Sequence, residues 1–211
     1  MLKALFFIVL LSLNAYGSPD RNWEFQTEKN GISVYKAFMP GTKIAGARGE
    51  AIIKSPMNRI LFVLSDIENA GQWIDRLTVS KVLERNGLLE TVVYQEFSLP
   101  WPISDRNFVF RGRAHKEDDG RVIIELKSED NKLAPPSKGV RGELIESKYV
   151  LTPISETETK LEVEIFADPK GAIPTWLINL IQKSWPIKTI GAIRIQVAKP
   201  YVVNAILPKT I

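Results

Sequence analysis

Hydrophobic and polar residues alternate along much of the second half of the chain. The clearest stretch places Leu161, Val163 and Ile165 in alternation with Glu162 and Glu164. Successive side chains of a β-strand point to opposite faces, so this pattern predicts one face toward the interior and one toward water. Asn-Gly and Asp-Gly pairs between such stretches favour tight hairpins. The pattern predicts strands over Val79–Arg85, Glu90–Leu99, Phe108–Lys116, Arg121–Ser128, Glu146–Pro153 and Thr159–Ala167.

The first part of the chain is predicted to form a hairpin followed by a helix. Alternation begins at Ile32–Tyr35, and Lys43–Ile53 is predicted to be the returning strand. Ser55 and the proline after it are typical of a helix start, because serine caps free amides and proline suits the first helical position. Apolar residues then recur at helical spacing across Ile60–Ile67. Ser18–Asn30 is predicted to be a short helix or an irregular leading segment.

A long C-terminal helix is predicted from Ile173 to about Val197. Pro186 lies in its middle and is expected to kink it. Apolar residues cover more than one side, so the helix needs contacts on several sides or borders an apolar cavity. Trp176 and Trp185 are about 2.5 helical turns apart and must therefore face opposite sides.

The order of these elements predicts an α+β fold in which strands and helices are segregated along the chain. A long antiparallel sheet curls rather than staying flat, and the C-terminal helix is the element that it can wrap around. The space between them is then either solid core or a cavity. The segment Glu129–Gly142 is too long for a simple hairpin turn and is expected to act as a lid.

The N-terminal residues have the pattern of a secretory signal peptide. Lys3 precedes an apolar run from Ala4 to Leu13, and small residues follow at Ala15 and Gly17. The run is shorter than the roughly 20 residues of a transmembrane helix. We therefore expect a cleaved signal peptide over residues 1–17, a single domain over residues 18–211, and a periplasmic or secreted protein. An uncleaved anchor or a buried helix is the alternative interpretation.

Composition and charge exclude several classes of chemistry. The 211 residues contain no Cys and one His, His115, so thiol catalysis and zinc sites with several histidines are excluded. The net charge of +4 is spread along the chain without a run of like charges, so no nucleic acid partner is expected. We expect neither a cofactor nor a metal ion, because no phosphate-binding glycine loop or nucleophile motif is present.

Three segments resemble START (steroidogenic acute regulatory protein-related lipid transfer) domains. Asp66–Trp73 resembles the helix-to-strand junction of the family, and Leu99–Val109 (LPWPISDRNFV) is similar to its P-x-x-x-x-R-D-[FY]-V motif. Asp168–Asn179 (DPKGAIPTWLIN) is similar to the signature ahead of the last helix. The resemblance spans roughly residues 20–200. It departs at Asn107, where the family usually has Asp.

The resemblance implies a bacterial exported member with the helix-grip fold, in which a curved antiparallel sheet wraps around a long C-terminal helix. Such a protein binds a lipid or another hydrophobic ligand in an internal cavity without catalysis, and transfers or senses it. We expect a monomer that contacts membranes transiently. The expected ligand-binding residues lie on inward strands and the last helix: Tyr94, Glu96, Trp101, Arg106, Phe108, Phe110, Trp176, Leu177, Leu180, Ile181, Ser184 and Ile187.

Several alternatives stay open at this point. A polyketide cyclase or aromatase of the same fold would use Tyr94, Glu96 and Arg106, and a scaffold domain would have a filled core. Glu96 either contacts a ligand head group or faces water. Arg106 is assigned to a structural ion pair or loop cap in preference to ligand binding. Trp101 is assigned to the core, with lid and membrane contact as alternatives.

Overall fold

The computed structural model describes residues 21–39, 44–87, 89–137 and 139–205. Two helices, α1 (Met57–Ser65) and α2 (Thr175–Gln196), and a short 3-10 turn, η1 (Ala70–Gln72), accompany one large sheet. The strands are β1 (Glu24–Lys29), β2 (Ile32–Phe38), β3 (Ala45–Ile53), β4 (Leu77–Asn86), β5 (Glu90–Phe97), β6 (Arg106–Lys116), β7 (Val122–Ser128), β8 (Val140–Arg141), β9 (Glu143–Pro153) and β10 (Thr159–Asp168).

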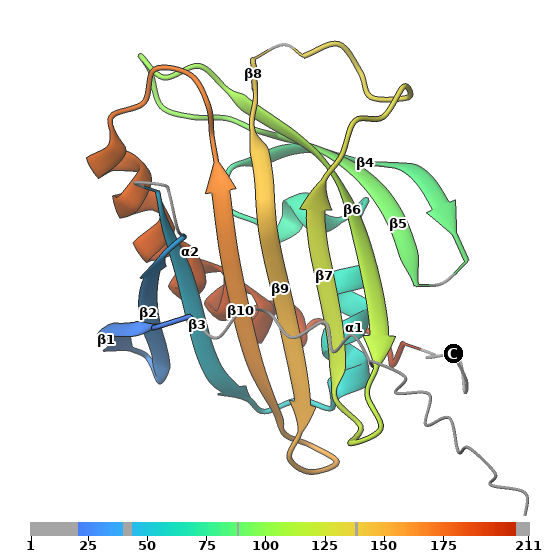
Figure 1. Cartoon of the computed structure of the whole chain (residues 1–211). Coiled ribbons are helices and arrows are strands. Elements are labelled where there is room, and N and C mark those ends of the chain that lie inside the picture. Colours follow the sequence, from blue (N-terminus) through green and yellow to red (C-terminus); the bar gives the residue numbers. More distant parts are fainter. Residues whose placement is uncertain (1–20, 40–43, 88, 138, 206–211) are drawn as a thin grey trace, which may run out of the picture.

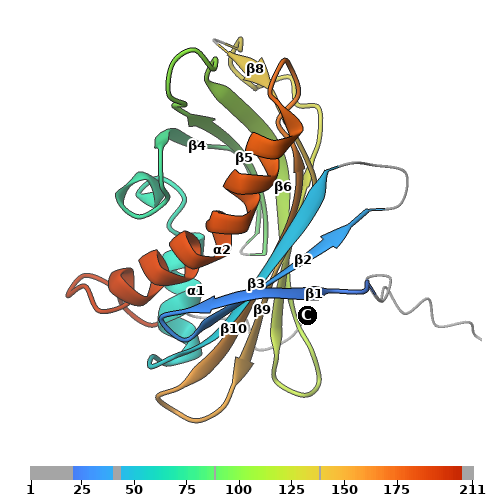
Figure 2. The same ribbon diagram turned by 90° about the vertical axis from the view of Figure 1, so that its left-hand side faces the viewer.

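The strands form one curved sheet in the order β1-β2-β3-β10-β9-β7-β6-β5-β4. These neighbours pair antiparallel, and the short β8 adds a parallel pair to the start of β6. The sheet curls, and α2 and α1 lie on its concave side (Figures 1 and 2). The predicted α+β helix-grip architecture is therefore confirmed.

The core lies between the concave face of the sheet, α1 and the C-terminal half of α2. Inward residues of the central strands, such as Leu151 and Leu161, are fully buried against Ile60 of α1 and against Ile190 and Ile193 of α2. The N-terminal half of α2 is different, because Trp176, Leu180 and Ile181 stay exposed. The helix is thus anchored to the core at one end only, and it bends along its length (Figure 2).

Gly49 sets how closely α2 approaches β3. A Cβ atom added at Gly49 would lie 2.4 Å from Cβ of Pro186 and 3.1 Å from Cδ1 of Ile190. Only a residue without a side chain allows this approach, so the buried Pro186 rests directly on the strand backbone. The contact divides the concave side into two regions, one on each side of α2.

Two local predictions are wrong. The described part of Ser18–Asn30, predicted to be a short helix or an irregular leading segment, contains the edge strand β1, which pairs with β2. Ser55 does not cap α1: its Oγ donates to the carbonyl of Pro56, and no side chain caps the helix. The proposed signal peptide, residues 1–17, lies outside the described residues. In the part of the chain that the structure describes, neither helix has the length and apolar character required to span a bilayer.

Candidate functional site

A cavity of about 110 Å³ lies between α2 and the concave face of the sheet. Its walls come from the two residues that follow η1, from strands β5, β6, β7, β9 and β10, and from the middle of α2. The lining side chains are mainly apolar and aromatic: Trp73, Ile74, Gln95, Phe97, Phe108, Phe110, Leu126, Leu144, Ser147, Tyr149, Ile165, Ala167, Trp185 and Thr189.

One wall of the cavity is aromatic, and the alternation of side chains along β5 and β6 determines which residues form it. Gln95 and Phe97 of β5 and Phe108 and Phe110 of β6 point to the same face, because Gln95 pairs with Phe108 in the ladder. The rings of Phe97 and Phe108 meet edge-on, with centroids 5.9 Å apart. Rings in this arrangement attract each other and hold their positions, so this wall is preformed.

A second pair of lining rings consists of Trp185 of α2 and Tyr149 of β9. Their rings are also edge-on, with centroids 6.4 Å apart. Burial raises the pKa of the Tyr149 hydroxyl well above its usual range, so this group stays neutral. Its hydroxyl makes no hydrogen bond to another described residue, and it is therefore available to a polar atom of a ligand.

Two other polar side chains of the lining already make hydrogen bonds within the protein. The side-chain amide of Gln95 donates to Ser80 Oγ at 3.2 Å, and Ser147 Oγ donates to the carbonyl of Glu164 at 2.7 Å. None of the lining residues is a carboxylate, a histidine or a basic residue. The described residues also contain no cluster that suits a metal ion. This lining suits an uncharged apolar group and offers no general acid–base pair.

Of the predicted strand residues, Phe108 and Phe110 line the cavity, whereas Tyr94 and Glu96 lie on the opposite face of the sheet. Tyr94 is fully buried there against Val92 and Val109. Its hydroxyl donates to Glu96 Oε1. Burial, followed by the effect of Glu96, raises the pKa of Tyr94 to about 12. Glu96 thus has a partner within the protein, and neither residue reaches this cavity.

Arg106 and Trp101 lie beside the cavity rather than in it. Arg106 is buried and donates hydrogen bonds to the carbonyls of Pro169 and Lys170, at 2.8 and 3.1 Å, and to that of Ser104. It thereby joins the start of β6 to the loop before α2, as a structural role predicts. Trp101 is 93% exposed, so its assignment to the core is wrong.

The predicted residues of α2 are divided between several environments. Trp176, Leu180 and Ile181 are exposed, and Leu177 is half-buried. Ser184 Oγ donates to the carbonyl of Ile181, and Ile187 packs against the main core. None of these six residues lines the 110 Å³ cavity. Their contact with a ligand stays a prediction.

Most of the lining was not predicted from the sequence, including Trp73, Gln95, Phe97, Tyr149 and Trp185. Alternation along β5 could have suggested Gln95 and Phe97, because it places them together on the face opposite to Tyr94 and Glu96. Choosing between these two sets of residues required knowing which face of β5 lies on the concave side of the sheet. Trp185 faces away from Trp176, as the helical spacing required: it lines the cavity, whereas Trp176 lines a separate groove.

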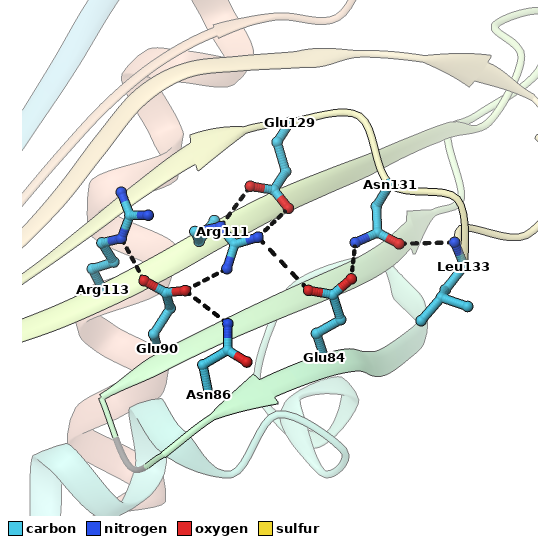
Figure 3. Close-up of polar contacts among 8 residues, drawn as sticks. All are labelled: Glu84, Asn86, Glu90, Arg111, Arg113, Glu129, Asn131 and Leu133. Atoms are coloured by element: carbon cyan, nitrogen blue, oxygen red, sulfur yellow. Dashed lines mark hydrogen bonds and ion pairs between the residues drawn. The ribbon is translucent and has the colours of Figure 1, made fainter.

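The predicted lid, Glu129–Gly142, is attached to the convex face of the sheet. Ala134 packs over the Tyr94 cluster, and Asn107 is bonded to Ser137 and Arg141 of this segment. Figure 3 shows a second attachment, in which Arg111 binds Glu129 and Glu84 while Asn131 donates to Glu84. The described part of this loop covers the face that is opposite to the cavity.

Comparison with known proteins decides the family. The START domain family model matches residues 11–190 of the chain. The chain belongs to the START domain family. An uncharacterized protein of Pseudomonas aeruginosa is 28% identical over 174 residues, which cover 82% of this chain and 85% of that relative. The phosphatidylcholine transfer protein of Homo sapiens is 27% identical over 168 residues, which cover 77% of this chain and 78% of that protein.

Solved structures agree with this assignment. A STAR-related lipid transfer protein from Xanthomonas axonopodis superposes with a TM-score of 0.75 and 26% identity, covering 84% of this START chain and 99% of the other. Human STARD10 superposes with a TM-score of 0.77 over 84% of this chain and 74% of its own, at 20% identity, which shows a shared fold. The family-level property of these proteins is binding or transfer of lipids.

Proposed function

We propose that this START domain carries a lipid, with at least one acyl chain held in the cavity between α2 and the concave face. The observation that supports this most is the lining, which is aromatic and apolar and holds no charged residue. Burying a hydrocarbon chain contributes about 0.8 kcal/mol per CH₂ group. Binding of an acyl chain therefore requires no specific polar contacts, and the protein acts as a carrier rather than an enzyme.

A whole phospholipid needs more space than about 110 Å³, because ligand pockets usually measure about 300–1,000 Å³. The N-terminal half of α2 is the element best suited to make that space. Trp176, Leu180 and Ile181 in this half are exposed, whereas Ile190 and Ile193 in the C-terminal half are buried in the core. Movement at Pro186, which interrupts the helical hydrogen bonding, would open the cavity beside Trp185. Ligand exchange is then limited by this opening.

In this proposal the monomeric protein works in the periplasm or outside the cell and contacts membranes transiently. The β5–β6 connection and the loop before α2 lie at the same end of the molecule, and Arg106 ties them together (Figure 1). Trp101 on the first of these segments is exposed, as is Trp176 at the start of α2. Exposed tryptophans suit the boundary between head groups and acyl chains.

A matched pair of variants tests the proposal. Leu126→Trp adds bulk to the cavity wall, whereas Glu125→Trp adds the same side chain at the adjacent position on the other face of β7, where Glu125 is exposed. We expect the first variant to lose most transfer of fluorescent phosphatidylcholine between vesicles and the second to retain it. Thermal unfolding of both proteins checks that each is folded.

Native mass spectrometry of protein purified from its own host gives an independent measurement. A co-purifying lipid whose amount falls in the Leu126→Trp protein supports the carrier function. A folded Leu126→Trp protein that transfers lipid at the normal rate would contradict it. Absence of both a bound lipid and transfer activity in the unmodified protein would favour the scaffold interpretation.

A further inference from the structure

A second hollow, of about 310 Å³, lies on the other side of α2. We call it the edge groove. It is formed by the N-terminal half of α2 and by β1, β2 and β3 at one edge of the sheet. Its lining consists of Gln26, Val34, Tyr35, Lys36, Ala45, Gly46, Ala47, Trp176, Asn179, Leu180 and Lys183. No residue of this lining belongs to the lining of the inner cavity.

The contact of α2 with β3 separates the two spaces. Pro186 rests on the backbone of Gly49, and Ile190 is fully buried next to it. The residues of α2 that face the inner cavity are Trp185 and Thr189, which belong to the middle of the helix. The edge groove is therefore a separate site and not an extension of the inner cavity.

The shape of the edge groove results from small residues on the strands and large ones on the helix. Ala45 and Ala47 form a low floor, and Trp176 and Leu180 stand beside it, 68% and 56% exposed. An exposed tryptophan and leucine beside an apolar floor leave apolar surface in contact with water. A hydrocarbon segment that covered them would be stabilised by the hydrophobic effect.

The charge of the edge groove selects one class of ligand. Lys36 and Lys183 line it, and no carboxylate does. Neither lysine forms an ion pair with another described residue, although Lys36 Nζ lies 4.4 Å from the ring centroid of Phe38. In contrast, Lys160, Lys170 and Lys188 each contact a carboxylate. Glu24, the cross-strand neighbour of Lys36, is exposed and lies outside the lining. Two ammonium groups without an ion-pair partner beside an apolar wall complement an anion that carries a hydrocarbon tail.

We propose that the edge groove is a second ligand site, which binds a single-chain amphiphile with an anionic head. Lys36 and Lys183 hold the head, and the tail lies against Trp176, Leu180 and the alanine floor. The volume is at the lower end of the range for ligand pockets and suits one chain rather than a two-chain lipid. This inference does not depend on what the inner cavity carries.

The test uses dodecanoate, with dodecyltrimethylammonium as a probe of the same chain length and opposite charge, both below micelle-forming concentrations. Amide NMR shifts in the purified protein locate the probe: we expect dodecanoate to shift Ala45 and Ala47 of the groove floor. In the Leu126→Trp protein the added indole ring fills the inner cavity. Calorimetric titration of this protein therefore measures binding at the edge groove.

The double variant Lys36→Gln/Lys183→Gln should weaken dodecanoate binding at the groove by about tenfold or more, because each lost charge-assisted contact contributes on that scale. The double variant Lys81→Gln/Lys127→Gln removes the same charge from exposed strand positions outside the groove and should bind normally.

Three results would each overturn the inference: shifts confined to residues of the inner cavity, equal affinity of the two double variants, or equal binding of the cationic probe. Each of them leaves the phosphatidylcholine transfer test unaffected, so failure of one proposal is distinguishable from failure of the other.

Discussion

Single residues decide how the helix and the sheet fit together in this protein. The clearest case is Gly49, where Pro186 of α2 approaches the strand backbone more closely than any side chain permits. Arg106 is a second case. Its guanidinium makes hydrogen bonds in several directions to carbonyls that precede α2. A lysine has neither the fork geometry nor the number of donors for these bonds.

Gly49→Ala should destabilise the protein by about 1–3 kcal/mol, which is the usual cost of overpacking a well-packed contact. Strand propensity alone predicts the reverse, because alanine is less flexible than glycine. Urea unfolding measures the change. Gly191→Ala is the matched control: it lies in α2, where an added Cβ meets no atom within 4 Å, and it should stabilise by about 0.5–1 kcal/mol. A neutral Gly49→Ala would mean that α2 shifts freely on β3.

At the scale of elements, the convex face of β4, β5 and β6 holds the long loop in place through charge. Arg111 contacts Glu90 at 2.5 Å, Glu129 at 2.6 Å and Glu84 at 3.7 Å, and Arg113 contacts Glu90 at 2.6 Å (Figure 3). Glu90 lies at the junction of the two arginines. Hydrogen bonds from Arg113, then from Asn86 and Arg111, lower its pKa to about 2.

The acid stability of the protein should reflect this shift. The folded-state pKa of Glu90 lies below its unfolded value of about 4.3, so its stabilising contribution is present above that value and is lost as the pH falls toward 2. The difference in melting temperature between the unmodified protein and Glu90→Gln should therefore be largest near neutral pH and should shrink between about pH 4.3 and pH 2.

Added salt should reduce the same difference, because exposed ion pairs are screened. Glu125→Gln on β7, an exposed carboxylate without an ion pair among the described residues, should show neither dependence. A difference for Glu90→Gln that does not change with pH would assign its effect to packing instead of charge.

At the scale of the whole molecule, the two halves of α2 have different attachments. The C-terminal half packs with α1 and the central strands through Ile190 and Ile193, whereas the N-terminal half borders the edge groove on one side, reaches the inner cavity at Trp185 and leaves Ile181 exposed. Segments with few buried apolar contacts open at low free-energy cost. The fold therefore combines a fixed end and a movable end in one helix.

Hydrogen exchange should report this difference directly. We expect amides of α2 before Pro186 to exchange faster than those around Ile190 and Ile193, and phosphatidylcholine vesicles to slow exchange in the first half as lipid is taken up. Mass spectrometry of peptides from α2 gives both rates. Uniform slow exchange along α2, with or without vesicles, would exclude its first half as the gate.

Local sequence pattern was enough to predict the class of fold, since strand alternation, turn pairs and the long apolar C-terminal segment are all local features. It also determined the family through short motifs, and the opposite orientation of Trp176 and Trp185 through helical geometry. Tertiary structure alone decided which face of β5 is concave, and hence that Gln95 and Phe97 line the cavity while Tyr94 and Glu96 do not. Alternation defines two faces of a strand, but only the curl of the assembled sheet makes one of them the inside.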